Sequence, residues 1–221
     1  MKIFCRRLSG WALVLLIFPL AQVQAQGLEL MGQFMKQVNS GRANFTQVVT
    51  SPAKTGQPAR QKISTGSLEF RRPGQFRFVY MKPFAQTLLA DGQNFWLHDV
   101  ELNQITVRKQ SLVLGTTTPM ALLTSAADVK VLEADFQLRS EPAHDGLEWV
   151  RATPKAQDGQ IQFLMAGFRK TDKGVELLVI DVQDSLGQRS VLTLNSLELN
   201  PALGADTFVF RPPAGVEVIR P

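Results

Sequence analysis

The chain has 221 residues with 24 basic and 19 acidic side chains, a formal net charge of +5 and a single cysteine, Cys5. Three of the basic side chains lie in the first 25 residues, which contain no acidic one, so the other 196 residues carry 21 basic and 19 acidic side chains and a net charge of +2. This balance argues against a nucleic-acid partner, and the length suits one medium-sized domain with a hydrophobic core.

The first 25 residues have the features of a secretory signal peptide. A basic start precedes ten apolar residues from Trp11 to Leu20, and Val23-Gln24-Ala25 ends in a small residue. A membrane-spanning helix needs about 20 residues, so we expect cleavage after Ala25 rather than a retained anchor. Cleavage removes Cys5, which excludes disulfides and cysteine-ligated metals from residues 26–221. We expect no metal and no cofactor.

An amphipathic helix is predicted at the start of the domain. Its apolar side chains recur at spacings of three and four residues, and they are Leu28, Met31, Phe34, Met35 and Val38. Asn39-Ser40-Gly41 ends the pattern. A second short helix is predicted from Thr118 to Ser125, because Thr118 can cap it and Pro119 suits its first position. A further short turn is predicted around Pro201 to Ala205.

Most of the remaining chain alternates with period two, which is typical of half-buried strands. In the segment 75–80, for example, Phe76, Phe78 and Tyr80 point to one face and Arg77 to the other. The predicted strands are residues 43–50, 66–70, 75–80, 86–90, 94–98, 104–109, 135–140, 147–152, 160–168, 175–183, 188–198 and 208–210. Short turn-like separators between them predict an antiparallel meander that curls into a barrel or half-barrel. No repeat or linker divides residues 26–221, so we expect a single domain.

Two interpretations are open for the apolar side chains of such a sheet and its helices. Met31, Met35 and Met120 suit a ligand-holding interior, because methionine adapts to irregular shapes. Periodicity alone favours the simpler interpretation that these are ordinary core residues.

Five local patterns then follow one another along the chain. They are Asn44-Phe45-Thr46-Gln47, the segment 66–83 with its Arg72-Pro73 turn and aromatic strand, Asp91-Gly92 leading to Trp96, Thr118-Pro119, and FVFRPPAGV at 208–216. In this order they resemble the LolA family of lipoprotein carriers over essentially the whole of residues 26–221. Two positions depart from the family: Phe78 replaces a tryptophan, and His98 stands where an aromatic residue is common.

The resemblance implies a mainly β fold with a few helices, an incomplete, half-open antiparallel β-barrel with a helical lid over an apolar cavity. It implies that Arg72, the basic residue of the R-P turn, is the latch between barrel and lid. The predicted residues of the acyl-chain cavity are Met31, Phe34, Met35, Val38, Leu68, Phe70, Phe76, Phe78, Tyr80, Leu88, Trp96, Met120 and Leu123.

The resemblance also implies a function, that of a monomeric periplasmic chaperone. Such a carrier receives triacylated lipoproteins from an inner-membrane ABC transporter like LolCDE, shields their acyl chains and delivers them to an outer-membrane receptor like LolB.

Other functions fit the sequence less well. An enzyme would have to use His98 or His144, which are followed by aspartates but form no catalytic motif. A LolB-like receptor needs a lipidated cysteine after its signal, and none is present. A lipoprotein-binding or lipid-binding periplasmic sensor of the same superfamily is the alternative, although a sensor normally carries a further domain after the barrel.

Overall fold

The computed structural model describes residues 26–53, 55–113, 124, 128–156 and 160–221. The helices are α1 (Gln26–Gln37), α2 (Gln110–Val113) and α4 (Val129–Asp135). The first strands are β1 (Ser40–Ser51), β2 (Arg60–Arg71), β3 (Gln75–Lys82), β4 (Gln86–Asp91), β5 (Asn94–Asp99) and β6 (Gln104–Lys109). The later strands are β7 (Phe136–His144), β8 (Leu147–Pro154), β9 (Ile161–Thr171), β10 (Gly174–Asp184), β11 (Arg189–Leu199) and β12 (Glu217–Ile219).

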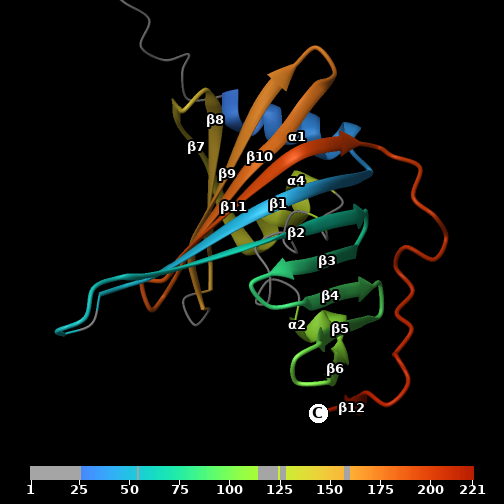
Figure 1. Cartoon of the computed structure of the whole chain (residues 1–221). Coiled ribbons are helices and arrows are strands. Elements are labelled where there is room, and N and C mark those ends of the chain that lie inside the picture. The colour runs from blue at the N-terminus through green and yellow to red at the C-terminus, as the bar shows by residue number, and fades with distance from the viewer. Residues whose placement is uncertain (1–25, 54, 114–123, 125–127, 157–159) are drawn as a thin grey trace, which may run out of the picture.

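These strands form one 12-stranded sheet in the described part of the chain, in the order β12-β6-β5-β4-β3-β2-β1-β11-β10-β9-β8-β7. Two antiparallel meanders, β1–β6 and β7–β11, are joined where β1 pairs with β11 (Figure 1). The sheet curves but does not close, because β7 and β12 stand at its two ends. The predicted mainly β, half-open fold is therefore confirmed.

Strand pairing brings the large apolar side chains of the first meander to one face, called the concave face here. Phe70 pairs with Phe76, Phe76 with Ala90, and Ala90 with Phe95. A second row on the same face, two residues further along each strand, consists of Ala43, Leu68, Phe78, Leu88 and Leu97. Because side chains alternate across a strand, the residues between these rows point to the opposite, convex face.

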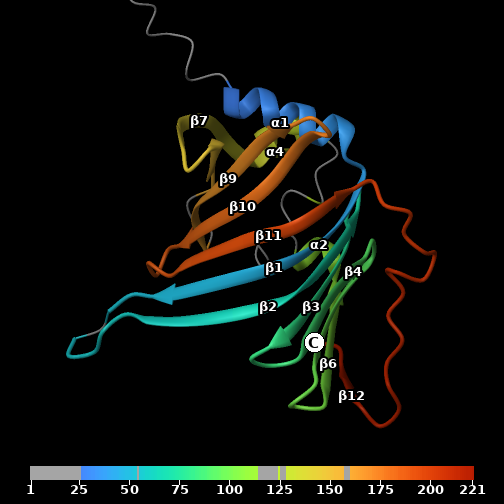
Figure 2. The same ribbon diagram turned by 45° about the horizontal axis from the view of Figure 1, so that its top comes forward.

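Helix α1 lies against β7, β8, β9 and β10 on the concave side (Figure 2). Its first turn approaches the sheet very closely at Gly27, where an added Cβ atom would lie 2.3 Å from the carbonyl oxygen of Trp149. Only glycine allows this approach, so a single residue fixes the distance between the beginning of α1 and β8.

The chain after β11 crosses the convex face of the first meander. The Phe208 ring lies under the Arg71 guanidinium, 5.2 Å from it, and Phe210 stacks on Trp96 with ring centroids 5.0 Å apart. The chain then ends in β12, which pairs with β6 in parallel. Together these contacts cover Leu89 and Ile105, which are buried on the convex face.

Several predicted elements differ from the structure. Residues 208–210 form no strand; they pack against the sheet by their aromatic rings, and the last strand is β12. The turn predicted around Pro201 to Ala205 lies at residues 205–208. The helix predicted from Thr118 to Ser125 falls outside the described residues except for Thr124, and α2 and α4 were not predicted. Among the described helices, none has the length and apolar character needed to cross a membrane.

Candidate functional site

Aromatic rings form the floor of the candidate site on the concave face. The Phe78 ring meets Phe45 and Phe76 edge-on, with centroid distances of 5.5 and 5.9 Å, and Phe76 lies 6.2 Å from Phe95. Gly66 makes room for the Phe45 ring, since a Cβ atom there would come within 2.8 Å of it. The floor is thus a continuous apolar surface that reaches from β1 to β5.

Helix α1 covers the other half of the concave face. Met31 and Phe34 are each only 1% exposed, and Phe34 packs against Phe168 of β9 at a centroid distance of 5.7 Å. Val38, just after the helix, is equally buried, and its backbone N–H donates to the carbonyl oxygen of Phe34. Met31, Phe34, Met35 and Val38 of the predicted apolar stripe are therefore buried, whereas Leu28 is only half-buried and the buried Leu30 was not predicted.

The space between α1, α4 and the second meander is small. A cavity of about 10 Å³ is lined by Met31, Leu132, Phe136, Val150, Ala152, Leu164 and Ala166. That volume is about what one water molecule requires, and the lining is apolar throughout. As the described residues enclose it, this cavity has no room for a ligand much larger than a water molecule.

Arg72 connects the β2–β3 turn to the end of α1. Its Nη1 donates to the carbonyl oxygen of Met35 at 3.0 Å, and its guanidinium lies over the Phe34 ring at 5.1 Å. The Met35 carbonyl is among the last of the helix, where a cation is favoured by the helix dipole. Burial lowers the pKa of Arg72 to about 10, so the side chain remains charged at neutral pH. Its Nε is buried and has no hydrogen-bond partner among the described residues.

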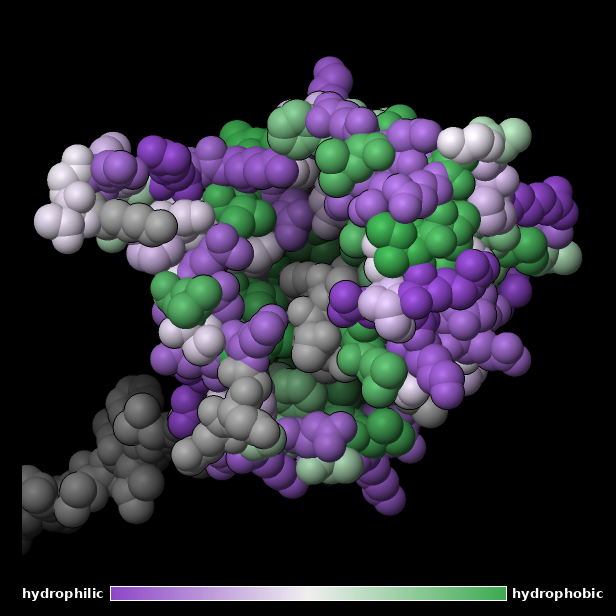
Figure 3. All heavy atoms as spheres, turned by 90° about the horizontal axis from the view of Figure 1, so that it is seen from below, coloured by the Kyte–Doolittle hydropathy of each residue, from purple (hydrophilic) through white to green (hydrophobic). Residues whose placement is uncertain are grey.

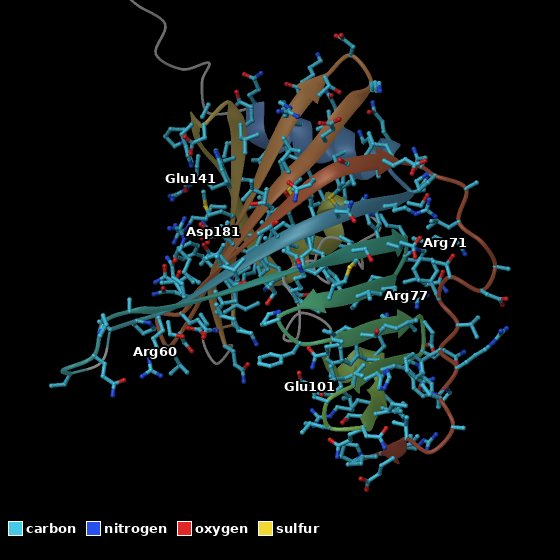
Figure 4. The ribbon with its side chains drawn as sticks, viewed as in Figure 1. Arg60, Arg71, Arg77, Glu101, Glu141 and Asp181 are labelled. Carbon is cyan, nitrogen blue, oxygen red and sulfur yellow. The ribbon has the colours of Figure 1, made fainter. Side chains whose placement is uncertain are left out.

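The neighbouring Arg71 points to the convex face and holds another segment. Its Nη2 donates to the carbonyl oxygen of Leu203 at 3.1 Å, and its guanidinium covers Phe208. Arg71 and Arg77 both lie toward the side of the sheet that the C-terminal segment follows (Figure 4). The adjacent residues Arg71 and Arg72 thus hold different segments against opposite faces of the sheet. Arg71 contacts the C-terminal segment and Arg72 contacts α1.

A line of polar contacts marks the end of the apolar floor. The Tyr80 hydroxyl donates to Gln47 Oε1 at 3.0 Å, and Gln47 Nε2 donates to the Ser190 hydroxyl at 2.8 Å. The Tyr80 ring still belongs to the apolar surface, because it packs edge-on against Phe45 at 5.0 Å. Burial raises the pKa of Tyr80 to about 12, so its hydroxyl stays protonated and able to donate.

Most of the predicted cavity residues share the concave face. Those that lie buried in one cluster are Met31, Phe34, Met35, Val38, Leu68, Phe70, Phe76, Phe78 and Leu88, and Tyr80 packs against that cluster. Met120 and Leu123 fall outside the described residues.

The placement predicted for Trp96 is wrong. Trp96 lies on the convex face, where its Nε1 donates to Asp91 at 2.9 Å and its ring stacks on Phe210. Its neighbours Phe95 and Leu97 belong to the concave face instead. Alternation within residues 94–98 separates Phe95 and Leu97 from Trp96, but it does not say which of the two sides faces the interior.

The curved open sheet, its apolar concave face and the covering helix define a half-open β-barrel protein with a sheltered hydrophobic surface. The model of the family described as "Outer membrane lipoprotein carrier protein LolA" matches residues 36–211. The chain belongs to this family.

Individual relatives support this membership. The chain is 54% identical over 196 residues to the "Outer-membrane lipoprotein carrier protein" of Albidiferax ferrireducens, covering 89% of this chain and 92% of the relative. It is 43% identical over 214 residues to the protein of that name from Methylibium petroleiphilum, covering 97% and 98%. An uncharacterized conserved protein from Thermus thermophilus shares the fold, with a TM-score of 0.51, 11% identity and coverage of 88% and 98%.

Proposed function

We propose that this protein carries triacylated lipoproteins and shields their acyl chains against the concave face. The observation that supports this most directly is the apolar surface shared by Phe45, Phe76 and Phe78, which continues under α1. The relatives named as outer-membrane lipoprotein carriers support the same cargo. The protein acts as a carrier and not as an enzyme.

The proposed route lies in the periplasm. Residues 1–25 act as a cleaved signal peptide, and residues 26–221 form the single carrier domain. The protein receives its cargo from an inner-membrane ABC transporter of the LolCDE type and delivers it to an outer-membrane receptor of the LolB type. It works as a monomer.

The energetics of the cargo require a cover that opens and closes. Three acyl chains of roughly 15 methylenes each would gain on the order of 35 kcal/mol on transfer from water to an apolar surface. Noncovalent affinities saturate near 20 kcal/mol, and a carrier must still release its cargo. Displacing α1 from the sheet opposes binding, and Arg72 holds the end of that helix through a hydrogen bond and a ring contact. We therefore propose α1 as the lid and Arg72 as its latch.

A reversible cross-link tests whether α1 must move. The backbone N–H of Leu28 donates to the Ser140 hydroxyl at 3.0 Å, so α1 and β7 are adjacent at these positions. In the secreted protein, the double variant Leu28→Cys/Ser140→Cys would contain the only two thiols, because Cys5 lies in the signal peptide. We expect the oxidised variant to take up no lipoprotein from inner-membrane vesicles that contain the transporter, and the reduced variant to regain uptake.

The two single-cysteine variants are the controls, since they test the substitutions without the bond. Uptake by the oxidised double variant at the wild-type rate would show that cargo does not enter beneath α1. Failure of the wild type itself to take up lipoprotein would contradict the proposed function.

A further inference from the structure

The concave face of the first meander is apolar at one end and polar at the other. Beyond Phe78, Leu88 and Leu97, the next residues on the same face are Tyr80, Gln86 and Asp99, which pair in one row across β3, β4 and β5. On β1 and β2 the corresponding change is from Phe45 and Gly66 to Gln47 and Ser64. On β1 and β2 the polar residues therefore begin one row further along than on β3, β4 and β5, because Phe45 and Gly66 lie in the same row as Tyr80, Gln86 and Asp99.

This polar end forms a groove of about 410 Å³, within the size range of small-molecule sites. The groove is lined by residues of strands β1 to β5 and of the turns that follow β3 and β5. Lys62 of β2 lies over the Phe84 ring at 4.9 Å, and Glu101 and Leu102 follow β5. Figure 4 shows Glu101 at the turn that follows β5, beside the left-hand ends of these strands. Seen from below, the molecule has a hollow in which hydrophobic and hydrophilic residues meet (Figure 3).

The polar side chains of this groove differ in what they are free to bind. The side-chain amide of Gln47 already makes hydrogen bonds with Tyr80 and with Ser190, and it lies at the end of the apolar floor. Gln86 and Ser64 line the groove beside it and make no side-chain hydrogen bond with other described residues. An amide and a hydroxyl supply both donors and acceptors without a net charge.

We infer that this groove binds the polar neck of the cargo, meaning the ester-linked glycerol, the N-acylated cysteine and the first peptide groups. The inference rests on the proposed function, since acyl chains on the Phe78 floor would bring the neck to the level of Tyr80. Ester and amide groups that lay against the phenylalanine rings would lose their hydrogen bonds to water without replacement. Gln86 and Ser64 offer that replacement where the apolar surface ends.

Two probes separate the neck from the acyl chains. One is a synthetic tripalmitoyl-glycerylcysteinyl peptide with a short serine tail, and the other is a fluorescent hexadecyl probe without glycerol or peptide. We expect Gln86→Ala and Ser64→Ala each to weaken binding of the lipopeptide by about 3- to 10-fold, the size of one lost hydrogen bond. Binding of the hexadecyl probe should not change.

Gln61→Ala is the matched control for Gln86→Ala. Gln61 is exposed on β2 and lies outside the groove, so the same substitution should leave both affinities unchanged. Wild-type lipopeptide affinity in both groove variants would overturn the inference while leaving the proposed function intact. If the wild type binds neither probe, the proposed function fails instead.

Discussion

At the scale of single residues, the lowered pKa of Arg72 follows from the burial of its guanidinium beside the end of α1. Water is removed from its guanidinium, which lowers its pKa to about 10, and the Met35 carbonyl and Phe34 ring replace only part of that hydration. Its buried Nε, which has no hydrogen-bond partner in the described part of the chain, adds to the cost of burial. An anchor of this kind holds α1 without making the closed form very stable.

Replacing Arg72 should loosen α1 and little else. In Arg72→Leu the Met35 carbonyl loses a charged donor, an interaction of about 1.5–3 kcal/mol, so we expect amide hydrogens of α1 to exchange about 10- to 100-fold faster. Delivery of cargo to the receptor should slow, because closing of the empty protein no longer assists release. Hydrogen exchange followed by mass spectrometry and a receptor-transfer assay measure the two effects.

Arg71→Leu is the control, because it removes the same charge from the adjacent residue. Its contacts are with Leu203 and Phe208, so exchange should rise in the C-terminal segment and not in α1. Unchanged protection of α1 in Arg72→Leu would mean that Arg72 is only a turn residue.

Tyr80 gives a second residue-level prediction, because it is the single tyrosine of the chain. Its pKa should be about 12 in the folded protein, against about 10 in the unfolded chain, so tyrosinate absorbance should titrate at those two values. The folded state holds this proton more tightly. Tyr80 therefore contributes stability that is complete below about pH 10 and is lost as the pH rises toward 12.

The pH dependence of the unfolding free energy is a poor measure of the Tyr80 contribution, since Arg72 contributes with the opposite sign. The pKa of Arg72 is lowered on folding, so its deprotonation near pH 10 favours the folded state as the pH rises. Tyrosinate absorbance reports the titration of Tyr80 alone, without a contribution from Arg72. A native titration midpoint near 10 would show that the Tyr80 hydroxyl is hydrated and does not border a dry surface.

At the scale of elements, two glycines of α1 make opposite predictions for the same substitution. A methyl group on Gly27 would collide with the backbone of β8, so Gly27→Ala should lift the first turn of α1 and reduce stability by about 1–3 kcal/mol. Gly32 has nothing within 4 Å of an added Cβ atom, so Gly32→Ala should raise stability by about 0.5–1 kcal/mol. Urea denaturation compares the two variants; equal effects would show that α1 does not pack on β8.

The elements that the sequence predicts well are those whose pattern is local. Alternation identified β3, and helical spacing identified the buried face of α1, because each needs only its own residues to show one apolar side. The four residues of α2 are too few to show a helical period. Residues 208–210 alternate like a strand, but their aromatic rings are held by Arg71 and Trp96 from distant parts of the chain.

Trp96 shows the same limit within the candidate site. Either Trp96 or Phe95 could have faced the interior, since both are large and aromatic. The choice is made by Asp91, which accepts the indole N–H, and by Phe210, which stacks on the ring. A partner more than 100 residues away in sequence cannot be read from the alternation of one strand.

At the scale of the whole molecule, the position of α1 bears on the expected processing. Gly27, two residues after the expected cleavage site, is packed closely against β8. We expect the periplasmic protein to begin at Gln26 and to carry no lipid. The intact mass of the periplasmic form measures this; a mass that includes residues 1–25 or an added diacylglycerol would contradict it.

The close packing of α1 on the second meander has a further consequence for affinity. Met31 and Phe34 are buried against the sheet. In the proposed function they cover the apolar surface that the cargo binds, so α1 competes with the cargo for that surface. The apparent dissociation constant then equals the intrinsic one divided by the open fraction; if about one molecule in a thousand is open, binding weakens about 1,000-fold. Substitutions on the sheet side of α1 should therefore change cargo affinity in either direction through the open fraction, in addition to any contact that these side chains make with the cargo.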